Sequence, residues 1–167
     1  MKTRIKHIVL AIAILVSVSS FAQKDELKAL KRIYAKEVPS ANDIADYKAN
    51  LTKLEPLATE EGDKVYATFY KCMLPIVQIA SYGATITPAQ MAGAYSLKAV
   101  KDLATGLSAT LDYEKKTGKK VYTDDIAIKI AVVKPLIVNY AVGLGEAKKY
   151  KTSAASLYFL ASPKPTA

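Results

Sequence analysis

The chain has 167 residues, a formal net charge of +9, one histidine and one cysteine. This length fits a single domain with one sizeable core. The histidine is His7, near the N-terminus, and the cysteine is Cys72. Without residues 1–22, the chain therefore cannot form a serine–histidine–acid triad, a cysteine–histidine dyad, a histidine-ligated zinc site or a disulfide within one chain.

Residues 1–22 have the three-part layout of an export signal. Lys2, Arg4 and Lys6 precede an apolar run over residues 8–18, and small residues follow as far as Ala22. Because a membrane span needs about 20 apolar residues, this shorter run favours a cleavable signal over a permanent anchor. We predict a signal peptide at residues 1–22, cleavage after Ala22 and a periplasmic or secreted domain at residues 23–167.

The predicted mature chain is basic. Its 21 lysine and arginine residues against 15 acidic residues give a net charge of +6. Such a surface suits anionic partners, although a generally solvated lysine surface is the simpler interpretation. We expect no nucleic-acid partner, because the lysines are scattered and do not form the basic stripe that follows a phosphate backbone.

The first two predicted helices are separated by a proline. Apolar residues at helical spacing predict a helix over residues 24–38, which ends at Pro39. Ser40 is predicted to cap the second helix, with Asp43 at its third position near the exposed amides. The second helix has one apolar stripe, made by Ile44, Tyr47, Leu51 and Leu54.

Two long helices are predicted next. One covers residues 65–82 and should kink at its interior Pro75 before ending near Gly83. The other begins with a capping box at Thr87, Pro88 and Gln90. Its apolar pattern predicts a helix without a break as far as Lys116, before Gly118.

The last two predicted helices contain the most apolar part of the chain. Residues 123–125 should cap a fifth helix whose body, over residues 126–144, is expected to be the central buried helix, with the stems of Lys129 and Lys134 packed. These lysines and Asn139 make it a poor membrane span. Glycines at 143 and 145 are expected to allow a turn into a sixth helix over about 146–160.

The pattern predicts an all-α fold of about six antiparallel helices, arranged as a bundle or a solenoid. The grouped acidic residues Glu60, Glu61 and Asp63, and the pair Asp124 and Asp125, are explained by helix capping without catalysis. We therefore predict no enzyme, no catalytic residue, no metal site and no cofactor, and the ligand-binding residues stay open.

A few side chains permit a binding role. Tyr66, Phe69 and Tyr70 could form an aromatic binding shelf, although filling the gaps between helices is the favoured interpretation. Cys72 is expected to be a buried thiol that packs as a small hydrophobic group. Asn139 is a candidate for binding a peptide backbone, with a buried and hydrogen-bonded asparagine as the structural alternative.

Several segments together resemble exported bacterial tetratricopeptide-repeat proteins. They are residues 20–23, 24–28, 67–70, 117–123 and 150–163, and the last includes the small, aromatic, small spacing of Ala154, Tyr158 and Ala161. Because its helix pairs are unequal in length, the chain resembles a short or truncated member of this family with degenerate repeats. The resemblance implies stacked helical hairpins that present a groove to a protein or peptide. An array truncated at an apolar face should be less stable or should self-associate through its C-terminal helix pair.

Two functions follow as expectations. The first is a non-enzymatic helical-repeat scaffold that mediates protein–protein interaction in the cell envelope, through a groove lined by the first helix of each pair. The second is a small helical carrier, in which the kinked helices around Pro75 and Pro135 enclose an apolar ligand or lipid. A dry internal pocket of about 300 Å³ or more would favour the carrier.

Overall fold

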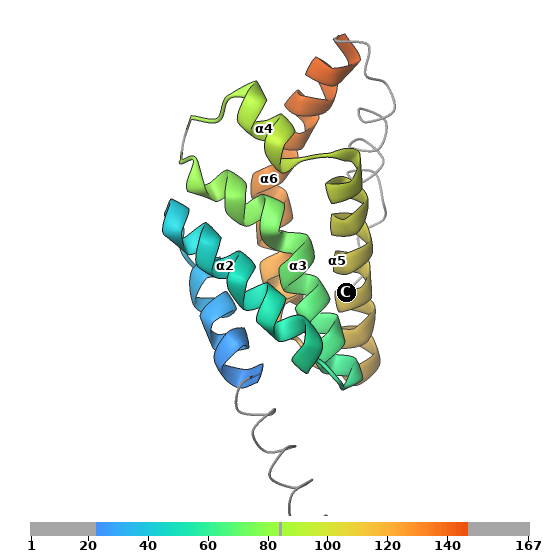
Figure 1. Cartoon of the computed structure of the whole chain (residues 1–167). Helices are drawn as coiled ribbons and strands as arrows, with labels where there is room; N and C mark the ends of the chain where they lie inside the picture. The colour runs from blue at the N-terminus through green and yellow to red at the C-terminus, as the bar shows by residue number, and fades with distance from the viewer. Residues whose placement is uncertain (1–22, 84, 147–167) are drawn as a thin grey trace, which may run out of the picture.

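The computed structural model describes residues 23–83 and 85–146, which form a body of helices (Figure 1). Neither range contains a strand, so the predicted all-α class is confirmed. The predicted signal peptide lies outside the described residues, as does the predicted sixth helix apart from Glu146. After a first helix over residues 23–34, the elements are α2 (Ala41–Leu54), the short 3-10 helix η1 (Glu55–Leu57), α3 (Glu61–Ser81), α4 (Pro88–Ala94), α5 (Leu97–Thr117) and α6 (Thr123–Glu146).

The central helix is α3. It packs against α2, α4 and α5 (Figure 1). Its apolar residues point in several directions, and the buried ones are Ala67, Phe69, Tyr70, Cys72, Met73, Pro75, Ile76, Val77 and Ile79. The prediction that residues 126–144 form the central buried helix is therefore wrong. That segment lies in α6, where Ile128 is 62% exposed and Val142 is 53% exposed.

The start of α2 has the predicted capping arrangement. The Ser40 Oγ accepts a hydrogen bond from the Asp43 amide at 3.2 Å, and the Asp43 carboxylate accepts one from the Ser40 amide at 2.8 Å. Lys36 also contacts Asp43, with its Nζ 2.6 Å from Oδ1. The Lys36 hydrogen bond and then those from Ser40 lower the pKa of Asp43 to about 2. The first helix ends at residue 34, earlier than predicted, and Lys36 belongs to the loop that leads to this cap.

This cap predicts a specific pH dependence. Because the pKa of Asp43 is lower in the folded chain than in the unfolded chain, the ionised carboxylate stabilises the fold above pH 4 or so, and this contribution is lost as the pH falls towards 2. Thermal unfolding should show Asp43→Asn less stable than the parent at pH 7 and equal to it near pH 2. Asp46→Asn, on the exposed side of the same helix, should show no such convergence.

The predicted helix from Pro88 to Lys116 is two helices. The capping box at Thr87 is confirmed, with the Gln90 amide donating to Thr87 Oγ1 at 3.3 Å. However, α4 ends at Ala94, and Ser96 caps α5 by accepting a hydrogen bond from the Ala99 amide at 3.1 Å. The Ser96 side chain caps a new helix here and so competes with a continuous helix. The predicted stop at Gly118 is confirmed by its left-handed backbone, with φ of 69°.

Two other helix boundaries differ from the prediction. α3 begins at Glu61, because Glu61 and Asp63 suit a first turn and Gly62 is tolerated there. α6 continues through the glycines at 143 and 145 to Glu146, so the turn predicted at these glycines is wrong. Glycine lowers helix propensity by about 1 kcal/mol, which is too little to end a long apolar helix by itself.

The first and last described helices contact each other. The Lys129 ammonium of α6 lies 5.3 Å from the centre of the Tyr34 ring, which belongs to the first helix. Next to it, Tyr122 stacks on Phe69 of α3 with ring centroids 4.2 Å apart. In an open solenoid each hairpin contacts only its neighbours. The described helices therefore close into a bundle, one of the two arrangements that the sequence permits.

Candidate functional site

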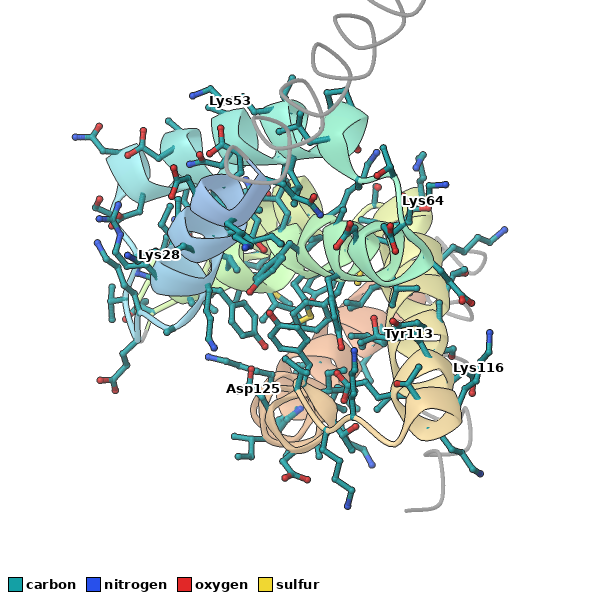
Figure 2. All side chains as sticks on the ribbon, turned by 90° about the horizontal axis from the view of Figure 1, so that it is seen from below. Lys28, Lys53, Lys64, Tyr113, Lys116 and Asp125 are labelled. Atoms are coloured by element: carbon teal, nitrogen blue, oxygen red, sulfur yellow. The ribbon has the colours of Figure 1, made fainter. Side chains whose placement is uncertain are left out.

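The aromatic residues of α3 form the core of the bundle. Phe69 and Tyr70 are fully buried, and Tyr66 is half-buried. Edge-to-face and stacked contacts join them to rings from every side, namely Tyr34, Tyr47, Tyr113 and Tyr122. Figure 2 shows Tyr113 of α5 at the end of the bundle, near α3. The binding-shelf hypothesis is wrong for these residues, and the packing interpretation is confirmed.

A short polar chain runs through this core. The Tyr47 hydroxyl donates to the Tyr70 carbonyl oxygen at 2.7 Å, and the hydroxyls of Tyr70 and Tyr122 lie 2.5 Å apart. Burial raises the pKa of Tyr47 and Tyr70 above the ordinary value for a phenol. Burial and then the neighbouring Asp125 carboxylate raise that of Tyr34 as well. These phenols stay neutral at physiological pH, so the chain of hydroxyls holds the core together without titrating.

Glu114, a buried carboxylate, fixes the start of α6. Its Oε1 accepts a hydrogen bond from the Tyr122 amide at 2.9 Å. Its Oε2 accepts bonds from the Thr123 amide at 3.0 Å and the Thr123 hydroxyl at 2.7 Å. Sequence reasoning missed this residue. The available signal was an acidic residue in the last turn of a helix, where the macrodipole disfavours negative charge.

The other acidic groups lie at helix starts, as predicted. Asp63 is in the first turn of α3, and Asp124 and Asp125 are in the first turn of α6. Glu61 pairs with Lys116 at 2.9 Å. Only the position of these acidic residues is confirmed, because the N-cap residue of α3, Glu60, makes no side-chain capping bond, and the amides of Tyr122 and Thr123 at the start of α6 donate to Glu114. Across the described ranges, no three histidine, cysteine or acidic side chains come together in a way that could hold a metal ion.

Cys72 is buried in the contact between α3 and α5, as predicted. It is 4% exposed, its thiol donates to the Phe69 carbonyl oxygen at 3.1 Å, and burial raises its pKa to about 12. Because the thiolate is the reactive form, we expect a maleimide at pH 7 to label the folded protein at least about a hundredfold more slowly than the urea-unfolded protein. Labelling at equal rates would show that the thiol is accessible.

A shallow hollow lies between α3 and the segment formed by η1 and Ala58. Its volume is about 170 Å³, and it is lined by Glu55, Ala58, Lys64, Ala67, Thr68 and Lys71. Lys71 forms an ion pair with Glu55 at this hollow. Its charged and exposed lining differs from the dry cavity expected of a carrier, and its volume is below the usual range for ligand sites, which begins near 300 Å³.

One side of α6 presents apolar residues to solvent. We call this the α6 outer face and define it by Ala127, Ile128, Ala131, Pro135, Val138 and Val142. All of these residues are exposed except Val138, which is half-buried. Ile126, on the opposite side of α6, is turned inward and is 2% exposed, and Ala141, beside the outer face, is also buried.

Polar residues border the α6 outer face. Lys134 and Asn139 are both exposed, so Asn139 is not the buried asparagine of the structural alternative, nor does it lie on an inner helix surface. A helix that is apolar on all sides is normally buried, and exposed apolar patches mark interaction sites. The α6 outer face is therefore the best candidate for a binding surface in the described part of the protein.

Comparison with known proteins does not identify a family for this chain. Models of protein families, curated proteins and solved structures give no significant match. Within residues 23–83 and 85–146, no helix combines the length and the apolarity needed to cross a membrane.

Proposed function

We propose that this chain is a non-enzymatic helical domain that mediates protein–protein interaction in the cell envelope. The observation that carries the proposal is the α6 outer face, where Ile128 and Val142 are each more than half exposed. Burying one such side chain against a partner gains about 1.5 to 3 kcal/mol. The proposed binding surface is the α6 outer face, and not the groove between helices expected from the sequence.

The distribution of charge supports an apolar contact over an anionic partner. Residues 23–83 and 85–146 contain 17 basic and 15 acidic side chains, so the described body is close to neutral. Of the remaining basic residues, three precede residue 23 and four follow residue 146. The basic character of the whole chain therefore gives little reason to expect an anion-binding surface on the described helices.

The buried groups support a role without catalysis. The Glu114 carboxylate is occupied by three hydrogen bonds that hold the start of α6, and the core phenols have raised pKa values. A general acid or base needs a pKa near the working pH and access to a substrate. The core phenols meet neither requirement, and the Glu114 carboxylate is buried away from any substrate.

Affinity capture from envelope extract tests the proposal. The full chain would be expressed with residues 1–22 and purified from the envelope fraction, alongside Ile128→Glu, Val142→Glu and, as a matched control, Val38→Glu. Val38 is 60% exposed but lies outside α6. We expect the parent and the control to retain the same few proteins and both α6 variants to lose them. Recovery of a lipid without protein would favour the carrier and overturn the scaffold.

A further inference from the structure

The loop between α5 and α6 is exposed along its whole length. Gly118, Lys119, Lys120 and Val121 are all exposed and lie outside both helices. The backbone hydrogen bonds that hold the described loops and caps include none from residues 119–121. Proteases cut folded proteins at exposed loops whose backbone is free of hydrogen bonds, because the chain there can enter the protease active site without unfolding its neighbours. The loop therefore has the backbone that a protease requires.

Two adjacent lysines distinguish this loop from the others. The loop before α2 holds Lys36, but its ammonium group forms an ion pair with Asp43 at 2.6 Å. The other basic residues in the ranges 23–83 and 85–146 all belong to helices. Among the loops of the described ranges, only the one between α5 and α6 therefore offers a lysine outside an ion pair.

We propose that the peptide bond between Lys119 and Lys120 is a processing site for a protease whose acidic pocket binds a lysine side chain. Water adds across this bond and leaves a carboxylate on Lys119 and an ammonium group on Lys120. Both residues on each side of the bond are exposed, from Gly118 to Val121. The bond after Lys120 is less accessible, because the buried Tyr122 follows closely and its amide donates to Glu114 at 2.9 Å.

The contacts that hold α6 in the bundle all lie on the far side of this bond. Tyr122 stacks on Phe69 at 4.2 Å, Thr123 donates two hydrogen bonds to Glu114, and Lys129 lies over the Tyr34 ring. Cleavage therefore leaves α6 in place but attached to the other helices by non-covalent contacts alone. The proposal goes beyond the proposed function, because cleavage does not depend on what the α6 outer face binds.

Limited digestion of the folded full chain with trypsin tests the accessibility of the bond. Among new N-termini between residues 23 and 146, mass spectrometry should detect Lys120 first. Lys119→Gln should slow the appearance of this N-terminus at least about tenfold, because the protease pocket loses its basic side chain. Lys115→Gln, an exposed lysine inside α5, should leave the rate unchanged. A first cut after Lys36, after Lys120 or within a helix would overturn the assigned bond.

Processing in the cell needs a second measurement. The full chain, purified from the envelope fraction, would be labelled at its free N-termini and analysed by mass spectrometry. We expect a fragment that begins at Lys120, that elutes from a gel-filtration column together with the preceding fragment, and that is absent from Lys119→Gln. Circular dichroism spectra matching that of the parent would show that this variant folds.

The two proposals fail in different ways. Recovery of the intact chain alone would overturn the processing site, even if trypsin cuts the bond in solution. Such a chain could still capture proteins through Ile128 and Val142, and the proposed function would then stand. If the fragment beginning at Lys120 eluted separately, the contacts of Tyr122, Thr123 and Lys129 would not be sufficient to retain α6, and that part of the proposal would be wrong.

Discussion

Replacing Glu114 with alanine is expected to destabilise the fold by about 3 kcal/mol or more. The substitution removes the acceptors of three hydrogen bonds and leaves the buried Tyr122 amide without its partner. A buried group that loses its partner costs about 1 to 3 kcal/mol, and bonds to a charged acceptor are stronger than neutral ones. The effect also spreads beyond α6, because Tyr122 stacks on Phe69 and its hydroxyl contacts that of Tyr70.

Urea unfolding followed by circular dichroism measures this effect. Glu114→Gln keeps one acceptor oxygen and should lose less, about 1 to 2 kcal/mol. Asp112→Ala, an exposed position on the same helix, should change the free energy of unfolding by less than about 0.5 kcal/mol. If Glu114→Ala were as mild as Asp112→Ala, the carboxylate would not be what holds the start of α6.

The starts of α2 and α4 were the most predictable part of this fold. The side chains that cap α2 and α4, Ser40 and Thr87, act within three residues of their own position, so their pattern is visible in a short window of sequence. Gly118 ends α5 for an equally local reason, since its backbone is left-handed. The break at Ser96 was missed because apolar residues continue at helical spacing on both sides of it.

The tertiary role of α6 could not be predicted in the same way. Its apolar residues surround the helix, so the sequence does not indicate which side faces inward. The aromatic residues contribute to this, because Tyr34 contacts Lys129 in the N-terminal half of α6 and Tyr122, directly before α6, stacks on Phe69. The role of Glu114 could not be predicted from its own helix either, because its hydrogen-bond partners lie beyond the end of that helix. The candidate binding surface therefore emerged only from the packing.

Replacing Gly106 with alanine is expected to destabilise the protein by about 1 to 3 kcal/mol, the usual cost of overpacking. A Cβ atom at position 106 would lie 2.5 Å from the Cys72 Sγ and 2.7 Å from its Cβ, closer than non-bonded atoms can approach. This contact joins α5 to the central α3. Helix propensity alone would make the alanine variant about 1 kcal/mol more stable than the parent. The predicted loss of stability is therefore opposite in sign to the effect of helix propensity.

Gly93→Ala provides the matched control. Gly93 also lies in a helix, but a Cβ there would meet no atom within 4 Å, so alanine should stabilise α4 by up to about 1 kcal/mol. Cys72→Ala added to Gly106→Ala should recover only part of the loss, because it removes the sulfur but keeps the Cβ of residue 72, which would still lie 2.7 Å from the new Cβ. If the two glycine-to-alanine substitutions change the free energy of unfolding in opposite directions, packing and not helix propensity decides the effect at position 106. A stabilising Gly106→Ala would mean that α3 and α5 can move apart without loss, and the close contact at Cys72 would then not be what sets their separation.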